Sequence, residues 1–221
     1  MTNLQHLQLV VDQKFHAVND DTGIPWRDVF TLNRPRVNFG VPIGQALMAR
    51  RSVRGIAGDR EVSSQILSEL LWSANGVNRA ATGDRTAPSW YHVNELEVFV
   101  LMSDGVWLYK PESHSLKLYF GGDIRSLAEL QDVAPDAPLH LIYVGNRAML
   151  RGMSPVEQMR AVSTHAGFAG QSVSLYCASE GLASVFRVFF DTEALASAMR
   201  LSDDQFIAFG QAVGYPEPDF A

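Results

Sequence analysis

Four side chains within a stretch of five residues are suited to bind an anion: those of Arg50, Arg51, Ser52 and Arg54. Arginine presents a planar fork of N–H donors that matches phosphate oxygens, and the serine hydroxyl can add a further donor. The stretch follows a short helical pattern over 42–48, so its cations could equally complement the dipole at the end of a helix. Spacing alone favours this second interpretation, because short basic clusters are frequent.

The sequence contains none of the common motifs in which side chains carry out catalysis by themselves. A Gly-x-Ser-x-Gly elbow, a His-Glu-x-x-His zinc helix, a Walker A loop and a Gly-x-Gly-x-x-Gly fingerprint are all missing. His140 has no second ligand at metal spacing, so we interpret it as structural. We therefore expect no metal site and no catalytic side chain. A cofactor that brings its own chemistry would need little more than an anion site.

The chain has 221 residues, a formal net charge of −6 and one cysteine, Cys177. The acidic balance argues against a nucleic-acid binder, because no extended basic surface accompanies the arginines. A single cysteine allows no disulfide within the chain, and the apolar helical run around Cys177 favours buried packing. With no signal sequence and no apolar stretch of membrane-spanning length, we expect a cytoplasmic protein without membrane contact.

Hydrophobic periodicity and turn residues predict one α+β domain over 42–221, after an irregular arm over 1–41. Trp26 and Phe30 could anchor this arm on the domain or on a partner subunit. The longest helix is predicted to begin with a capping box at Ser154 and Glu157 and to stop at a glycine. Helices are predicted over 42–48, 64–75, 123–130, 155–180 and 192–199, and strands over 96–102, 106–110, 116–119, 138–144, 183–190 and 206–213, with 116–119 at an edge of the sheet.

A segment rich in glycine, proline and small polar residues separates two of these elements, over 78–94. Loops of this length inside a compact domain are more often functional than idle. The adjacent aromatics Trp90 and Tyr91 have two interpretations that the sequence leaves open. They are either presented at the surface or packed beneath the loop.

Several short motifs occur in an order typical of one family. They are Arg-Arg-Ser-Val-Arg at 50–54, Leu-Leu-Trp-Ser-Ala-Asn-Gly-Val-Asn-Arg at 70–79, Arg-Thr-Ala-Pro-Ser at 85–89, Leu-Glu-Val-Phe-Val at 96–100, Gly-Leu at 181–182 and Val-Gly-Tyr-Pro at 213–216. Over 42–216 the chain resembles the nitroreductase superfamily of flavin enzymes. Within it, the resemblance is to the small-protein branch grouped with the azoline dehydrogenases. The order of the motifs now favours a functional role for the arginine stretch.

The resemblance implies an α+β nitroreductase-like fold, with a mostly antiparallel central sheet packed by helices. It also implies an interlocked homodimer with two flavin mononucleotides (FMN) at the interface. Carried over by position, the residues that hold the phosphate and ribityl chain would be Arg50, Arg51, Ser52 and Arg54. Pro88 and Ser89 would lie along the flavin of the other subunit. Backbone amides near the flavin N5 and O4 would come from Gly181, Leu182, Ala183 and Ser184, where fixed dipoles favour the anionic reduced ring.

The chain departs from the family pattern in three places. Relatives often carry an asparagine shortly after Pro-Ser, where this chain has Trp-Tyr-His-Val-Asn at 90–94. His165 and Ser172 stand where relatives often have an acid and an amide. The C-terminus lacks the basic tail that some members use on the phosphate, so phosphate binding would depend more on the arginine stretch.

The resemblance implies an FMN-dependent oxidoreductase that works by ping-pong hydride transfer. A nicotinamide donor, NADH or NADPH, would reduce the flavin, and a nitroaromatic or quinone would reoxidise it. One alternative is an oxygen-dependent dehydrogenase of a peptide or azoline substrate. Another is a flavin-binding module without turnover, in which Trp90 or Tyr91 covers the flavin.

Overall fold

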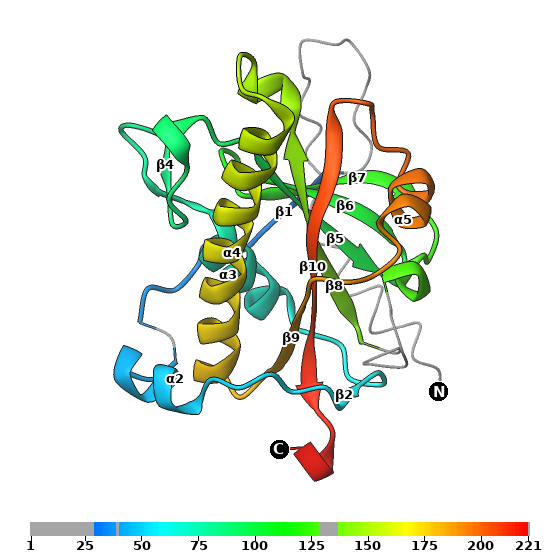
Figure 1. The fold of residues 1–221 in the computed structure, drawn as a ribbon. Coiled ribbons are helices and arrows are strands. Elements are labelled where there is room, and N and C mark those ends of the chain that lie inside the picture. The colour runs from blue at the N-terminus through cyan, green and yellow to red at the C-terminus, as the bar shows by residue number, and fades with distance from the viewer. Residues whose placement is uncertain (1–28, 39, 129–136, 221) are drawn as a thin grey trace.

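The computed structural model describes residues 29–38, 40–128 and 137–220, and its centre is an antiparallel sheet (Figure 1). The strands run in the order β1-β7-β6-β5-β8-β10-β2, and β9 also pairs with β10. A separate two-stranded sheet joins β3 to β4. The strands are β1 (Val29–Thr31), β2 (Ile56–Ala57), β3 (Val77–Arg79), β4 (Asp84–Arg85), β5 (Leu96–Met102), β6 (Gly105–Lys110), β7 (Ser115–Gly121), β8 (Leu139–Asn146), β9 (Ala183–Arg187) and β10 (Gln205–Pro216).

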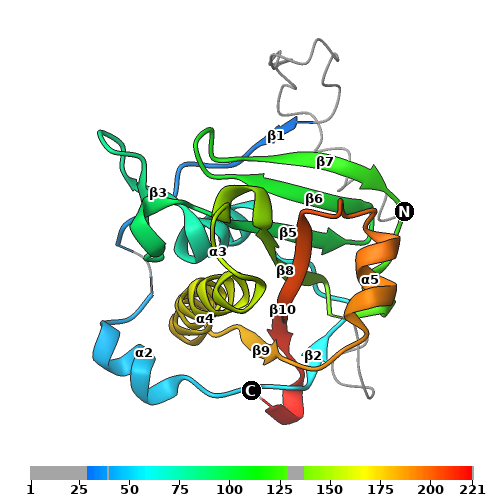
Figure 2. The same cartoon turned by 45° about the horizontal axis from the view of Figure 1, so that its top comes forward.

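Helices cover both faces of this sheet. The α-helices are α2 (Ile43–Ala49), α3 (Ser64–Asn75), α4 (Pro155–Ser179) and α5 (Thr192–Ala198), and the 3-10 helices are η1 (Trp90–His92), η2 (Arg125–Ala128), η3 (Arg147–Leu150) and η4 (Pro218–Phe220). Figure 2 shows α3 and α4 together on one side of β10, and α5 on the other side. The predicted α+β fold with a mostly antiparallel central sheet is confirmed.

Two hydrophobic cores result from the alternation of side chains along β5 and β8. Val98 and Tyr143 face α3 and α4, and pack with leucines and small residues of those helices. Phe99 and Ile142 face the opposite way, toward Leu195 of α5. Both central strands are therefore apolar at nearly every position, as expected for strands buried on two sides.

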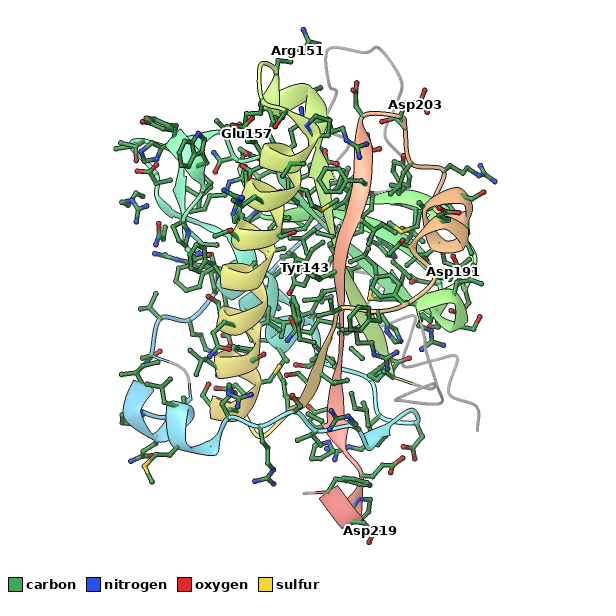
Figure 3. The ribbon with its side chains drawn as sticks, viewed as in Figure 1. Tyr143, Arg151, Glu157, Asp191, Asp203 and Asp219 are labelled. Atoms are coloured by element: carbon green, nitrogen blue, oxygen red, sulfur yellow. The ribbon has the colours of Figure 1, made fainter. Side chains whose placement is uncertain are left out.

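The helix α4 begins as the sequence predicts. The Ser154 side chain accepts a hydrogen bond from the backbone N–H of Glu157, and the Glu157 carboxylate accepts one from the backbone N–H of Ser154. This reciprocal cap fixes where the helix starts. Its inner face is tied to the sheet by Gln211, which accepts a 2.7 Å hydrogen bond from Tyr143 and donates to the Gly170 carbonyl and Ser174. Figure 3 shows Tyr143 at the centre of the molecule, beside α4.

Four predictions about these elements were wrong, and strand pairing explains two of the differences. The strand predicted over 183–190 ends at Arg187, and Phe189 beyond it is 84% exposed. The last strand is longer than predicted, because Tyr215 and Pro216 pair with β2. The predicted edge strand over 116–119 is covered by β1, which lies in the predicted irregular arm. Asp123 precedes a 3-10 turn over 125–128, where the sequence predicts an α-helix.

Some predictions concern residues outside the described ranges. Trp26 is one of these, and so are the last residues of the helix predicted over 123–130. Phe30 is described, and it packs against the core on the α3 side as an anchor of β1.

Candidate functional site

The arginine stretch follows α2 directly and is held against the sheet by its one apolar residue. The helix ends at Arg50, whose backbone N–H donates to the Ala46 carbonyl. Val53 then donates its backbone N–H to the Ser184 carbonyl at 3.0 Å, and its side chain packs against the small core beside β9. Because side chains alternate along an extended segment, Ser52 and Arg54 face away from this anchor and are exposed.

The arginines of this stretch have the chemistry of an anion site. Among the residues that the structure describes, no carboxylate forms an ion pair with Arg50, Arg51 or Arg54. Arg50 is half-buried, and the other two are exposed. Three guanidinium groups on one short segment, without a protein counter-charge in the described ranges, fit a phosphate group.

The turn after α4 lies beside this stretch, as the hydrogen bond between Val53 and Ser184 shows. Gly181 has φ +69°, a left-handed conformation that glycine adopts at little cost, and the Leu182 N–H donates to the Cys177 carbonyl at 2.8 Å. The expectation that the Leu182 amide faces a ligand is thus wrong, since that amide closes the helix. Ala183 and Ser184 are buried in β9, and of the predicted residues 181–184 only Gly181 is exposed.

Cys177, one turn before this glycine, is 1% exposed. Burial is the main cause that raises the pKa of its thiol to about 12. The thiol is therefore protonated at neutral pH, and the prediction that Cys177 is a packing residue is confirmed.

The segment predicted as a loop over 78–94 is more structured than expected. The strands β3 and β4 form a short hairpin, and η1 follows Pro88 and Ser89. Tyr91, His92 and Asn94 all have positive φ, which is strained for residues with a side chain. A 2.6 Å contact from His92 Nδ1 to the Asp84 carboxylate and the hydrogen bond from Ser89 to Asn94 hold this conformation.

The aromatic side chains of this segment are presented at the surface, one of the two interpretations left open by the sequence. Trp90 is 55% exposed and Tyr91 is 80% exposed, with their rings edge to face at 4.9 Å. Apolar rings held outward on a strained backbone are available to pack against a ligand or another subunit.

Pro88 and Ser89 do not meet the arginine stretch within one chain. They line a groove along the first half of α4, whereas the arginines lie beside its last turn. The helix has 25 residues and is thus about 37 Å long at 1.5 Å per residue. Figure 1 shows the β3–β4 hairpin and α2 near opposite ends of α4.

The groove at Pro88 has a volume of about 470 Å³ and a partly apolar wall. Its lining includes His165, which is 1% exposed and makes a 3.2 Å contact from Nδ1 to the Glu95 carboxylate. The sequence assigned no role to either residue. In the sequence this contact could be recognised only from a single acid before an apolar strand and a single histidine on an apolar helix face, 70 residues apart. The groove is lined by Pro88, Ser89, Trp90, Met153, Glu157, Arg160, Ala161, Thr164, His165 and Phe168.

Within the described ranges no group of three or more histidine, cysteine or acidic side chains could hold a metal ion. No described helix is both long and apolar enough to cross a membrane.

An antiparallel sheet with a long central helix on one face and an arginine stretch beside the end of that helix defines the nitroreductase-like α+β fold. The chain belongs to the nitroreductase family, whose model matches residues 47–215. The predicted family and the predicted oxidoreductase class are thereby confirmed, and members of this family use FMN. No curated protein matches the chain in sequence.

Solved structures agree with this assignment. The crystal structure of a candidate nitroreductase from Ralstonia eutropha JMP134 is 35% identical, with a TM-score of 0.83, and the match covers 86% of this chain and 90% of that chain. At lower identity the likeness concerns the fold alone. The Escherichia coli microcin synthetase McbBCD complex with truncated pro-MccB17 is 16% identical, with TM-score 0.68 and coverage of 98% and 83%. A candidate nitroreductase in complex with FMN from Desulfovibrio desulfuricans is 19% identical, with TM-score 0.57 and coverage of 82% and 90%.

Proposed function

We propose that this chain is an FMN-dependent oxidoreductase that passes a hydride from NADH or NADPH to a small organic acceptor of the quinone or nitroaromatic type. The observation that carries the proposal is the arginine stretch, three guanidinium groups unpaired among the described residues and placed beside the turn at Gly181. When bound, FMN supplies the two-electron carrier, and the protein supplies binding and orientation.

In this proposal the residues of the arginine stretch have a single task. Arg50, Arg51 and Arg54 hold the phosphate by charge-assisted hydrogen bonds, and the Ser52 hydroxyl adds a neutral one. Glu217 donates its backbone N–H to Gly55, which brings the end of the chain against this stretch. Residues 201–221 contain no arginine or lysine, so this segment offers the phosphate no cation.

The test of this proposal is the flavin content and its reduction. We expect purified protein to be yellow, to hold about one FMN per chain, and to lose its flavin absorbance within a stopped-flow trace when NADH or NADPH is added. Colourless protein that takes up no added FMN would contradict the proposal. Flavin that stays oxidised with both donors, but is reduced by a peptide or azoline substrate and reoxidised by oxygen, would favour the alternative dehydrogenase activity.

The proposed active unit is a homodimer in which Pro88 and Ser89 of one subunit reach the flavin held by the other. Its support is the surface of α2 and α4, which pack together and expose apolar side chains on their outer faces. Gly167, on the outer face of α4, has no atom within 4 Å of the position where a Cβ would stand, so another helix can approach closely there. The exposed apolar side chains are Ile43, Leu47, Met48, Met159 and Phe168.

Gly167→Arg is therefore expected to shift the protein from dimer to monomer while leaving the fold of each chain intact. The new side chain meets open space within one chain, but it would stand in the proposed interface. Sedimentation velocity measures the change, and Ala194→Arg on the exposed face of α5 is the matched control. A Gly167→Arg protein that remains dimeric with a full complement of FMN would place the interface elsewhere.

A further inference from the structure

The groove beside Pro88 contains a buried histidine with one ring nitrogen left open. His165 lies on α4 among the residues that line the groove, and its side chain is 1% exposed. Its Nδ1 contacts Glu95 Oε1 at 3.2 Å, while Nε2 has no hydrogen-bond partner among the described residues. A buried polar atom without a partner is costly, so such an atom at the wall of a groove suggests that a ligand completes it.

Glu95 makes this histidine different from an ordinary core residue. The carboxylate is fully buried just before β5, and His165 is its one side-chain partner in the described ranges. A buried carboxylate accepts a hydrogen bond from an N–H group. This places the hydrogen of the ring on Nδ1 and fixes the orientation of the ring. The second nitrogen, Nε2, is the polar ring atom of this groove-lining residue that has no protein partner in the described ranges.

The chain contains a second buried histidine that serves as a contrast. His140 on β8 is also 1% exposed, and its Nε2 is also without a partner among the described residues. Burial, together with the positive charges of Arg187 and Arg125, lowers the pKa of His140 to about 3. His140 is therefore neutral at physiological pH, and it does not line this groove.

We propose that His165, oriented by Glu95, is a catalytic residue that binds the electron acceptor in this groove and donates a proton to it. The proposal rests on the proposed function, because Pro88 and Ser89 line the same groove and are the residues proposed to reach the flavin of the partner subunit. Bound FMN, once reduced, would supply the acceptor with two electrons and one proton as a hydride. The oxygen of the acceptor receives the second proton from Nε2 of His165.

The proton and the charges balance within this site. The imidazolium becomes a neutral imidazole that keeps its Nδ1 hydrogen bond to the Glu95 carboxylate, and water entering the groove returns the proton. Two other charged side chains line the groove, Glu157 and Arg160. Glu157 is engaged by Ser154 in the helix cap, so it is held away from the acceptor.

The walls of the groove define the class of acceptor. Apolar and aromatic surface comes from Trp90, Met153, Ala161 and Phe168, and His165 is the proposed donor among the lining residues. A flat aromatic ring carrying a carbonyl oxygen, as in a benzoquinone, matches this combination, because the ring can stack while the oxygen accepts from Nε2.

The first test compares two acceptors in the oxidative half-reaction of the FMN-loaded protein. With His165→Gln, we expect reoxidation by 1,4-benzoquinone to slow by about 100-fold, the usual contribution of a general acid. Reoxidation by ferricyanide, which takes electrons without a proton, should be unchanged, and so should flavin reduction by NADH or NADPH. His140→Gln is the matched control and should change none of these rates. Equal slowing with both acceptors would overturn the proposal.

The second test does not depend on flavin and so separates this inference from the proposed function. In the purified wild-type protein labelled with ¹⁵N-histidine, we expect acetophenone, a non-reducible aromatic ketone, to shift the Nε2 resonance that is missing from His165→Gln. If that variant fails to fold, Glu95→Gln provides the assignment and should also slow reoxidation by benzoquinone more than by ferricyanide. An Nε2 resonance unmoved by saturating acetophenone would overturn the proposal.

Discussion

Replacing Arg50 and Arg54 together with alanine is expected to abolish the stoichiometric retention of FMN. Each arginine proposed at the phosphate contributes about 1.5–3 kcal/mol as a charge-assisted hydrogen bond. Loss of two such contacts weakens binding by about 100-fold or more, because every 1.4 kcal/mol is a factor of ten. Residues 201–221 contain no arginine or lysine that could replace the lost contacts. The flavin-to-protein ratio after gel filtration and a fluorescence titration with FMN measure the effect.

The control for this pair must remove the same charge elsewhere. Arg34 and Arg151 are both exposed, and Figure 3 shows Arg151 near the start of α4, far from the arginine stretch beside its last turn. The Arg34→Ala, Arg151→Ala double variant should bind FMN like the wild type. A full complement of FMN in the Arg50→Ala, Arg54→Ala protein would show that the phosphate is held elsewhere.

Glu69→Ala is expected to lower the free energy of unfolding by about 1–3 kcal/mol, the usual cost of removing the acceptor of buried hydrogen bonds. The Glu69 side chain is fully buried on α3 and pairs with Arg36 at 2.5 Å. It also accepts hydrogen bonds from Gln65 at 2.7 Å and from Tyr176 at 3.0 Å. Alanine would remove the acceptor that these hydrogen bonds share, and the Tyr176 side chain is itself buried on α4. Urea unfolding followed by circular dichroism measures the loss.

The same carboxylate gives stability a dependence on acid pH. Burial alone would raise the pKa of Glu69, but the hydrogen bonds from Arg36, Gln65 and Tyr176 outweigh it and lower the pKa to about 2. Because the pKa in the folded state lies below that in the unfolded state, this stabilisation is present above about pH 4.5 and is lost as pH falls toward 2. Glu69→Ala should flatten this part of the stability curve, whereas Glu61→Ala, at an exposed position, should leave it unchanged. A Glu69→Ala curve parallel to that of the wild type would show that the pair does not titrate in this range.

Local signals in the sequence were enough to place the main elements of the fold. The capping box at Ser154 marks the start of α4, and the apolar runs of β5 and β8 follow from their burial on both faces. Elements that depend on pairing between distant residues could not be predicted from the sequence. The strand β1 exists because Val29–Thr31 pairs with β7, some 85 residues later, and three residues carry too little pattern to be recognised.

The candidate site was predictable only in part, for the same reason. The arginine stretch could be identified from composition and motif order because its chemistry is contained in five neighbouring residues. The pairing of Glu95 with His165 joins positions 70 residues apart, and neither residue has a motif around it. The backbone amide of Leu182 shows the opposite case. The sequence predicts that it meets a ligand, but it donates to the Cys177 carbonyl at the end of α4.

The arginine stretch and the groove at Pro88 and Ser89 lie near opposite ends of α4, so a dimer formed from two different mutant chains would have two unequal flavin sites. If each flavin is held by the arginine stretch of one chain and by Pro88 and Ser89 of the other, every polypeptide contributes to both sites. A chain with a defective arginine stretch damages one site of the pair and still completes the other. Two chains with defects at opposite ends, each inactive with its own copy, would share between them one site with every part intact.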